Sequence, residues 1–198
     1  MVELKVLARI AAERFGGKPS ATRYRHDASD LWIDIVKCEG SLQGALDSYS
    51  TVGMSTFDNE TTGADGLPLR VELTAAAQPG WPLVANGLAS AAFNVGTGEY
   101  ICKPGIVYPD LFTGYEREVT TPHGLIWWPF VWDADWQPII EDGIHIEWLT
   151  VIPVTADEAE FFADHGADAL IDLFEQQTPD LYDLSRQSVS LSDTPTAG

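Results

Sequence analysis

The sequence predicts a single domain of the α/β (α+β) class, with helices and strands sharing one core. Three observations support this prediction. Apolar residues recur at helical spacing in some segments and alternate with a period of two in others. The length of 198 residues suits one domain better than two. Apolar residue types make up 45% of the chain, enough to build a core, so disorder is not expected.

An apolar stripe at helical spacing predicts the first helix over residues 2–15. The pair Gly16-Gly17 ends this helix, and Pro19 prevents its continuation. A second helix is expected to begin at Gly80-Trp-Pro82, where a proline in the first turn loses no hydrogen bond, and to stop at Gly96-Thr-Gly98. Its expected buried face consists of Val84, Leu88, Ala91, Ala92 and Val95.

The third predicted helix starts at a capping box, Thr155-Ala-Asp-Glu158. The Thr155 hydroxyl can accept a hydrogen bond from the backbone N–H of Glu158, while the Glu158 carboxylate reaches back to the start of the helix. Gly166 is expected to break this helix. Its expected buried residues are Ala159, Phe162 and Ala163 before the break, and Ala167, Leu170, Ile171 and Phe174 after it.

Strands are expected at five places, namely residues 31–36, 49–54, 69–74, 125–131 and 144–152. In the third segment Leu69, Val71 and Leu73 alternate with Arg70, Glu72 and Thr74, which predicts a half-buried strand. The last segment is apolar on both faces in its second half, as expected of a central strand. Pro129 suggests an edge or a bend in the fourth.

The remaining segments divide into a loop and a tail. Residues 57–68 are rich in glycine, aspartate and asparagine and are expected to form an exposed loop. Residues 188–198 are small and polar, so the domain is expected to span residues 1–187 and to end in a flexible tail. The segments show no internal repeat.

The net charge of −19 is concentrated toward the C-terminus. Residues 133–198 contain 15 of the 30 acidic side chains, while Arg186 is their one basic residue. The electrostatic field of this negative charge repels nucleic acid and attracts basic partners. The alternative is that the charge serves solubility alone.

Other features favour a cytoplasmic protein. No stretch approaches the roughly 18 apolar residues of a membrane-spanning helix, and the N-terminus lacks the pattern of a signal peptide. The two cysteines, Cys38 and Cys102, are expected to be reduced and partly buried.

The motifs of common enzyme classes are absent, so we expect no catalytic site, cofactor or metal. There is no phosphate-binding loop, no nucleophile elbow and no zinc-ribbon spacing. His145-Ile-Glu147 is similar to part of the zinc deaminase signature, but no Pro-Cys-x-x-Cys follows it. An enzyme with an unrecognised carboxylate or histidine site near residues 141–147 remains an alternative.

The most distinctive segment is Ile126-Trp-Trp-Pro-Phe-Val-Trp-Asp-Ala-Asp-Trp136, in which tryptophans lie beside carboxylates. As a strand it would place Trp128 and Phe130 on one face and Trp127 on the other. Tryptophan is enriched at binding interfaces. The alternative is that these residues pack in the core and anchor the following loop. The candidate partner-binding residues are Trp127, Trp132, Asp133, Asp135, Trp136, Glu141 and Asp142.

Several motifs together resemble the suppressor-of-fused family over about residues 45–190. They are Tyr49-Ser-Thr-Val-Gly-Met-Ser55, Val71-Glu-Leu-Thr74, the helix that starts at Trp81-Pro82, and Ile146 to Glu158 followed by His165-Gly166. The resemblance implies a mixed, mainly antiparallel sheet flanked by helices. It also implies a bacterial-type, stand-alone member that binds proteins. Animal members grip a peptide as an added strand between two domains, and this chain lacks length for the second domain.

The function expected from these observations is non-catalytic protein binding. The resemblance implies that many bacterial members are immunity proteins that neutralise toxins, and the acidic charge favours a basic protein partner. A regulatory scaffold of the suppressor-of-fused type is the alternative. Binding of nucleic acid or membranes is not expected.

Overall fold

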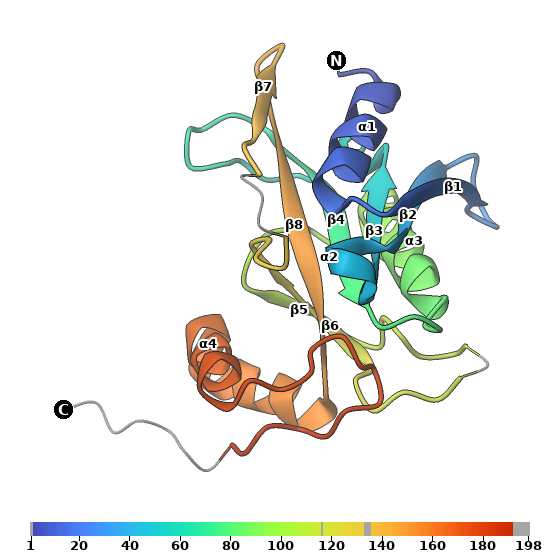
Figure 1. Ribbon diagram of the computed structural model, residues 1–198. Helices are drawn as coiled ribbons and strands as arrows, with labels where there is room; N and C mark the ends of the chain where they lie inside the picture. The colour runs from blue at the N-terminus through green and yellow to red at the C-terminus, as the bar shows by residue number, and fades with distance from the viewer. Residues whose placement is uncertain (1, 116, 133–135, 192–198) are drawn as a thin grey trace.

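The structure is a computed structural model that describes residues 2–115, 117–132 and 136–191. Its helical elements are α1 (Leu4–Phe15), α2 (Ser41–Gly44), the 3₁₀ turn η1 (Met54–Thr56), α3 (Leu83–Gly96) and α4 (Ala156–Gln177). Its strands are β1 (Lys18–Arg25), β2 (Trp32–Gly40), β3 (Leu46–Val52), β4 (Leu69–Ala77), β5 (Ile106–Tyr108), β6 (His123–Trp127), β7 (Ile139–Glu141) and β8 (Ile144–Val154). Figure 1 shows their arrangement.

Among the described residues, eight strands form one mixed sheet in the order β1-β2-β3-β4-β8-β6-β5, with β7 paired to β8. The β4–β8 pair is parallel and the other pairs are antiparallel. The predicted fold class, a mixed and mainly antiparallel sheet flanked by helices, is therefore confirmed. The central position predicted for residues 144–152 is also confirmed, since β8 lies between β4 and β6.

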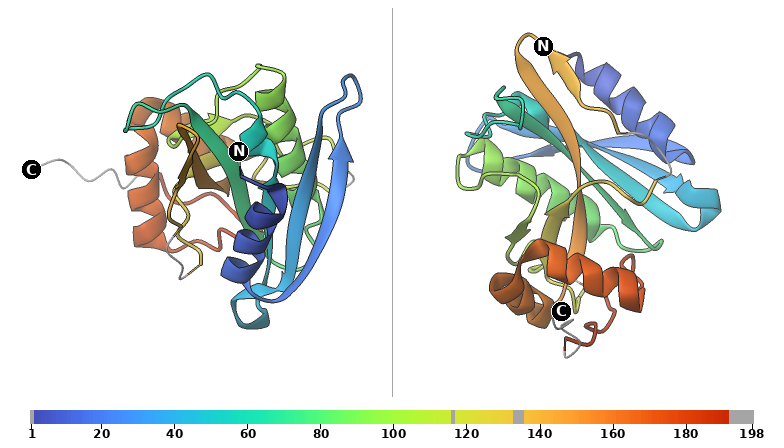
Figure 2. Two further views of the ribbon diagram at one scale, coloured as in Figure 1. Left: turned by 90° about the horizontal axis from the view of Figure 1, so that it is seen from above. Right: turned by 90° about the vertical axis from the view of Figure 1, so that its left-hand side faces the viewer.

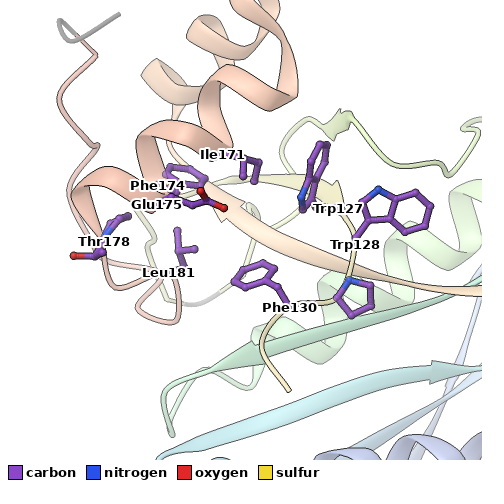
Figure 3. Close-up of a pocket in the computed structure, with 10 residues that line it drawn as sticks. Trp127, Trp128, Phe130, Ile171, Phe174, Glu175, Thr178 and Leu181 are labelled. Carbon is purple, nitrogen blue, oxygen red and sulfur yellow. The ribbon is translucent and has the colours of Figure 1, made fainter. Parts of the chain in front are cut away.

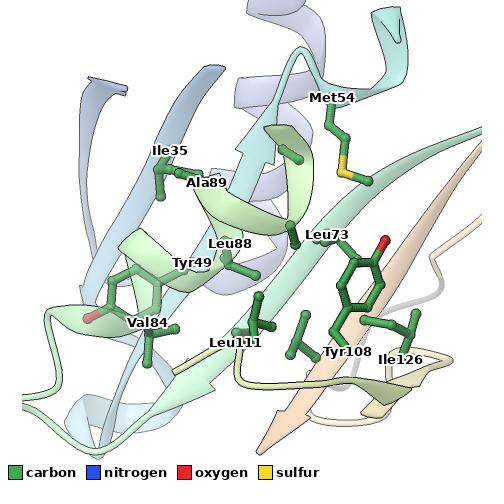
Figure 4. Close-up of a cluster of buried hydrophobic side chains, with 14 of the residues drawn as sticks. Ile35, Tyr49, Met54, Leu73, Val84, Leu88, Ala89, Tyr108, Leu111 and Ile126 are labelled. Atoms are coloured by element: carbon green, nitrogen blue, oxygen red, sulfur yellow. The ribbon is translucent and has the colours of Figure 1, made fainter. Parts of the chain in front are cut away.

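Helices cover both faces of the sheet (Figure 2). One face packs against α3 and forms the largest cluster of buried side chains, part of which is drawn in Figure 4. The opposite face carries α1 near one end of β8 and α4 near the other end. Along β8 the side chains of Trp148, Ile152 and Val154 point to this second face, while Leu149 and Val151 point toward α3. The chain that follows β6 crosses the second face between α1 and α4.

The strand β4 is buried on both faces, so the prediction of a half-buried strand is wrong. Glu72 and Thr74 are fully buried, although the alternating pattern placed them toward solvent. Strands β3 and β8 pair with the two edges of β4, and its buried polar groups find hydrogen-bond partners in β8, in β3 and in the turn after β3. The Thr74 hydroxyl donates to the carbonyl of Leu149 at 3.0 Å.

The helix α4 begins at the predicted capping box. The Thr155 hydroxyl accepts from the Glu158 N–H at 3.2 Å, and the Glu158 carboxylate accepts from the Thr155 N–H at 2.9 Å. The predicted break at Gly166 is present, with φ at +85°. The buried face before the break differs from the prediction, because Phe161 is buried and Ala163 is exposed.

The C-terminal segment returns across the molecule after α4. Val189 is buried against α4, and Gln177 and Ser190 exchange two hydrogen bonds of 2.7 and 2.8 Å. Residues 188–191 are therefore packed, which corrects the prediction of a tail from residue 188; residues 192–198 lie outside the described part. Both cysteines are free and buried, as expected. Within the described residues, no helix has the length and apolarity to cross a membrane.

Candidate binding groove

A groove of about 320 Å³ opens between the chain that follows β6 and the C-terminal half of α4 (Figure 3). We call it the aromatic groove. Its lining residues are Trp127, Trp128, Pro129, Phe130, Ile171, Phe174, Glu175, Thr178, Pro179 and Leu181. These side chains are predominantly apolar, and Glu175 is the one charged residue among them.

The first wall of the groove exists because β6 ends at Trp127. Pro129 has no N–H to donate, and proline is disfavoured in a strand that, like β6, pairs on both sides. The chain therefore leaves the sheet with two aromatic side chains in solvent, Trp128 at 45% exposure and Phe130 at 50%. Large apolar side chains exposed side by side along a groove are typical of interaction sites.

The second wall exists because α4 ends at Thr178. This residue adopts φ +46°, and its N–H donates to the carbonyl of Phe174 at 2.9 Å. The left-handed conformation ends the helix, and Pro179 prevents its continuation. The chain then turns back, so that Leu181 lies beside the apolar side chains of the last helical turns (Figure 3).

A buried ion pair fixes the segment behind this wall. Arg186 donates to both carboxylate oxygens of Glu158, at 2.6 and 2.7 Å, and to the carbonyl of Pro153 at 2.9 Å. The N–H of Val189 donates to the same carboxylate at 3.0 Å. Both charged side chains are almost completely buried. This two-point contact between a carboxylate and a guanidinium holds the returning chain in one position.

An acidic surface adjoins the groove. Asp168, Asp172 and Glu175 are exposed on α4 and lie at helical spacing on one face; we call them the acidic ridge. Arg186, the one basic residue of the C-terminal third, is buried against Glu158 and so adds little positive charge to this surface.

Of the predicted binding residues that the structure describes, Trp127 alone lines the groove. Trp132 is 3% exposed, and its indole N–H donates to the Ser48 hydroxyl at 2.8 Å. Trp136 is half-buried and packs between the rings of Phe15, Trp132 and Trp148. The two tryptophans fill the space between α1 and the sheet, so Trp132, one of the candidate partner-binding residues, lies in the core.

The two predicted acidic residues that the structure describes lie away from the groove. Glu141 and Asp142 are exposed at the turn between β7 and β8, which lies at the far end of β8 from α4 (Figure 1). Asp133 and Asp135 lie outside the described residues. Trp128 and Phe130 were missed as site residues, because strand alternation assigned them to one face of a strand. The sequence signal that could have located the end of the strand was Pro129, which lies between two aromatic residues.

The motifs that suggested the family serve the core rather than the groove. One carboxylate oxygen of Glu72 accepts from the N–H groups of Gly53 and Ser55 and from the Ser55 hydroxyl, and the other accepts from Thr51. Burial raises the pKa of Glu72, and the hydrogen bonds from the two hydroxyls oppose this effect. The Gly-x-Ser turn after β3 thus forms a cradle for a carboxylate on β4.

A second polar cluster corresponds to the region of the alternative enzyme hypothesis. The Nδ1 atom of His145 lies 2.8 Å from Asp65, and its Nε2 atom lies 3.3 Å from Glu147. Burial raises the pKa of Glu147, and the nearby His145 lowers it in part. Among the described residues, no group of three or more His, Cys, Asp or Glu side chains has a geometry that could hold a metal ion.

Comparison with known proteins gives a consistent result. Residues 30–187 match the family described as Suppressor of fused protein (SUFU). Immunity protein YqcF of Bacillus subtilis (strain 168) is 33% identical over 187 residues, which cover 94% of this chain and 97% of that protein.

Solved structures share the fold at lower identity. A putative SUFU homolog from Neisseria gonorrhoeae FA 1090 superposes with a TM-score of 0.60 at 16% identity, covering 86% of this chain and 87% of that one. A chain of the Sufu–Fu complex also gives 0.60 at 16% identity and covers 93% and 91%. Drosophila Suppressor of Fused gives 0.54 at 17% identity, with 80% of this chain matched to 42% of that one.

The resemblance predicted from the sequence motifs is therefore confirmed. With 158 consecutive positions matched and a relative 33% identical over nearly its whole length, the chain belongs to the suppressor of fused family.

Proposed function

We propose that this protein binds another protein without catalysing a reaction, and that it acts as an immunity-type inhibitor of a basic protein partner. The observation that carries the proposal is the 33% identity to a protein named as an immunity protein, over almost the full length of both chains. Similarity over the whole domain is more informative about a shared role than similarity of fold alone.

The charge supports the basic character of the partner. A net charge of −19 speeds the encounter with a cationic protein and disfavours association with nucleic acid and anionic lipid. An inhibitor with this charge can cover a cationic active site. The proposed location is the cytoplasm, in keeping with two free and buried cysteines.

The cluster of Asp65, His145 and Glu147 is the observation that favours a second candidate, an enzyme. A histidine between two carboxylates can move protons. We favour a structural role, because the contact between Asp65 and His145 ties the loop before β4 to β8, and the aromatic groove lies elsewhere.

The experiment that tests the proposal combines capture with inhibition. The tagged protein is used to capture partners from native lysate, and the captured protein is purified and recombined with it. We expect a stoichiometric complex in which the captured protein loses its own activity. A partner that retains full activity in the complex would instead support a regulatory scaffold. Turnover of a metabolite by the purified protein, abolished by His145→Ala, would support the enzyme.

A further inference from the structure

We infer that the aromatic groove is the docking site for the partner, and that its occupant is a protein segment with one bulky apolar side chain flanked by lysine or arginine. This inference rests on the proposed function and adds the location and the chemistry of recognition.

The bulky apolar side chain of the proposed occupant is inferred from the two walls of the groove. Trp128 and Phe130 expose about half of their surface beside the apolar side chains of Ile171 and Leu181 (Figure 3). Among the described residues, five large apolar side chains are exposed, and two of them border this one groove. Covering them with an apolar group removes their surface from water, which gives roughly 25 cal/mol for each Å² buried.

The size of the groove favours a side chain over a cofactor. Its volume of about 320 Å³ is at the lower end of the roughly 300–1,000 Å³ of small-molecule sites. The lining also offers few polar groups that could orient a cofactor. An aromatic or large aliphatic side chain fits such a site, as anchor residues do at protein interfaces.

The flanking lysine or arginine residues of the proposed occupant are inferred from the acidic ridge. Glu175 belongs both to the groove and to the ridge, and Asp172 and Asp168 continue along α4 by one and two helical turns. Successive turns are about 5.4 Å apart, so lysine or arginine side chains next to the anchor can reach these carboxylates. Arg186, the one basic residue of the C-terminal third, is engaged with Glu158, so it leaves these carboxylates open to positive charge from a partner.

One wall of the groove is shaped before binding. Its second wall is held by the α4 terminus at Thr178 and by the returning chain that the Glu158–Arg186 pair fixes. A site whose walls need no rearrangement loses less conformational entropy on binding.

The test selects peptides from a random 12-residue library displayed on phage against the purified protein. We expect enriched peptides with an aromatic or large aliphatic residue flanked by lysine or arginine. Their affinity should fall about tenfold or more for the Trp128→Ala/Phe130→Ala variant, as for loss of an anchor contact. The matched control is Ile140→Ala, since Ile140 is 61% exposed on β7, at the other end of β8. This control variant should bind the selected peptides with unchanged affinity.

A second pair of variants addresses the charges. Asp172→Asn with Glu175→Gln should weaken binding of the selected peptides and reduce its salt dependence. Enriched peptides that lack basic residues, or that bind the Trp128→Ala/Phe130→Ala variant equally well, would overturn the inference. Self-association that the same double variant abolishes, measured by analytical ultracentrifugation, would replace the partner by a second copy of this chain.

The groove and the proposed function can fail separately. If the wild-type protein and the Trp128→Ala/Phe130→Ala variant capture the same inhibited partner equally, the function stands and the groove assignment is wrong. If the wild type captures no protein at all, the proposed function is wrong.

Discussion

The carboxylate of Glu72 is fully buried yet accepts four hydrogen bonds from the turn that follows β3. Replacing it with glutamine puts an amide NH₂ group opposite donors. We predict that Glu72→Gln lowers the free energy of unfolding by about 1–3 kcal/mol, as expected when buried donors lose their acceptor. Denaturant titration measures this value, and Glu99→Gln on the exposed surface is the control.

The same residue predicts a pH dependence. Burial raises the pKa of Glu72 above its ordinary value of 4.5, so the native state holds the proton more tightly than the unfolded chain. Its contribution to stability is then greatest below pH 4.5 and is lost as the pH rises through the folded pKa. The difference in unfolding free energy between wild type and Glu72→Gln should narrow over that range. A difference that widens with pH would show that the buried carboxylate is held in its charged form.

Thr155 is a second residue whose structural role can be tested by one substitution. Since its hydroxyl caps the first turn of α4, Thr155→Ala should lower the free energy of unfolding by about 0.5–2 kcal/mol. Thr62→Ala, in an exposed loop, is the matched control. An unchanged unfolding midpoint for Thr155→Ala would mean that the cap does not form in solution.

The segment after β6 first lines the groove and then packs into the core, and Trp128 and Trp132 represent these two parts. Trp132 is packed against Phe15 with ring centroids 4.6 Å apart, whereas Trp128 stands in the groove. We predict that Trp132→Ala lowers the free energy of unfolding by about 3–5 kcal/mol. Trp128→Ala should lower it by about 1 kcal/mol or less. Equal losses for both variants, measured by denaturant titration, would show that the groove wall is part of the core.

The elements that could be predicted from the sequence are those whose own apolar pattern settles their burial. The helix over residues 4–15, the capped start of α4 and the strand at residues 144–152 are of this kind. The strand β1 was not predicted, because its residues are almost all exposed and lack an apolar alternation. Such a strand is held at the sheet edge by pairing with β2 rather than by its own burial.

The candidate site was predicted only in part for a related reason. The concentration of tryptophans directed attention to residues 127–136, but alternation cannot tell where a strand ends. The end of β6 at Trp127 turned Trp128 and Phe130 outward and left Trp132 to the core. The other wall depends on Thr178 and on the returning chain, whose position is set by tertiary contacts that local patterns do not contain.

At the scale of the whole molecule, the acidic charge should govern the rate of association more than the strength of the complex. We predict that neutralising Asp164, Asp168, Asp172 and Glu175 together slows association with the captured partner and flattens its salt dependence, while dissociation changes little. Stopped-flow mixing at several salt concentrations measures both rates. A change confined to dissociation would mean that these carboxylates are buried in the interface.

The central claim is that this family member works by binding a protein at the aromatic groove. The most direct measurement is calorimetric titration of the captured partner into the wild type, Trp128→Ala/Phe130→Ala and the control Ile140→Ala, with a thermal melt of each. Our account predicts binding weaker by about tenfold or more for the double variant, with a melting temperature lowered by no more than about 2–4 °C and unchanged affinity for the control. Equal affinity for all three proteins, or a loss that follows a larger fall in melting temperature, would contradict it.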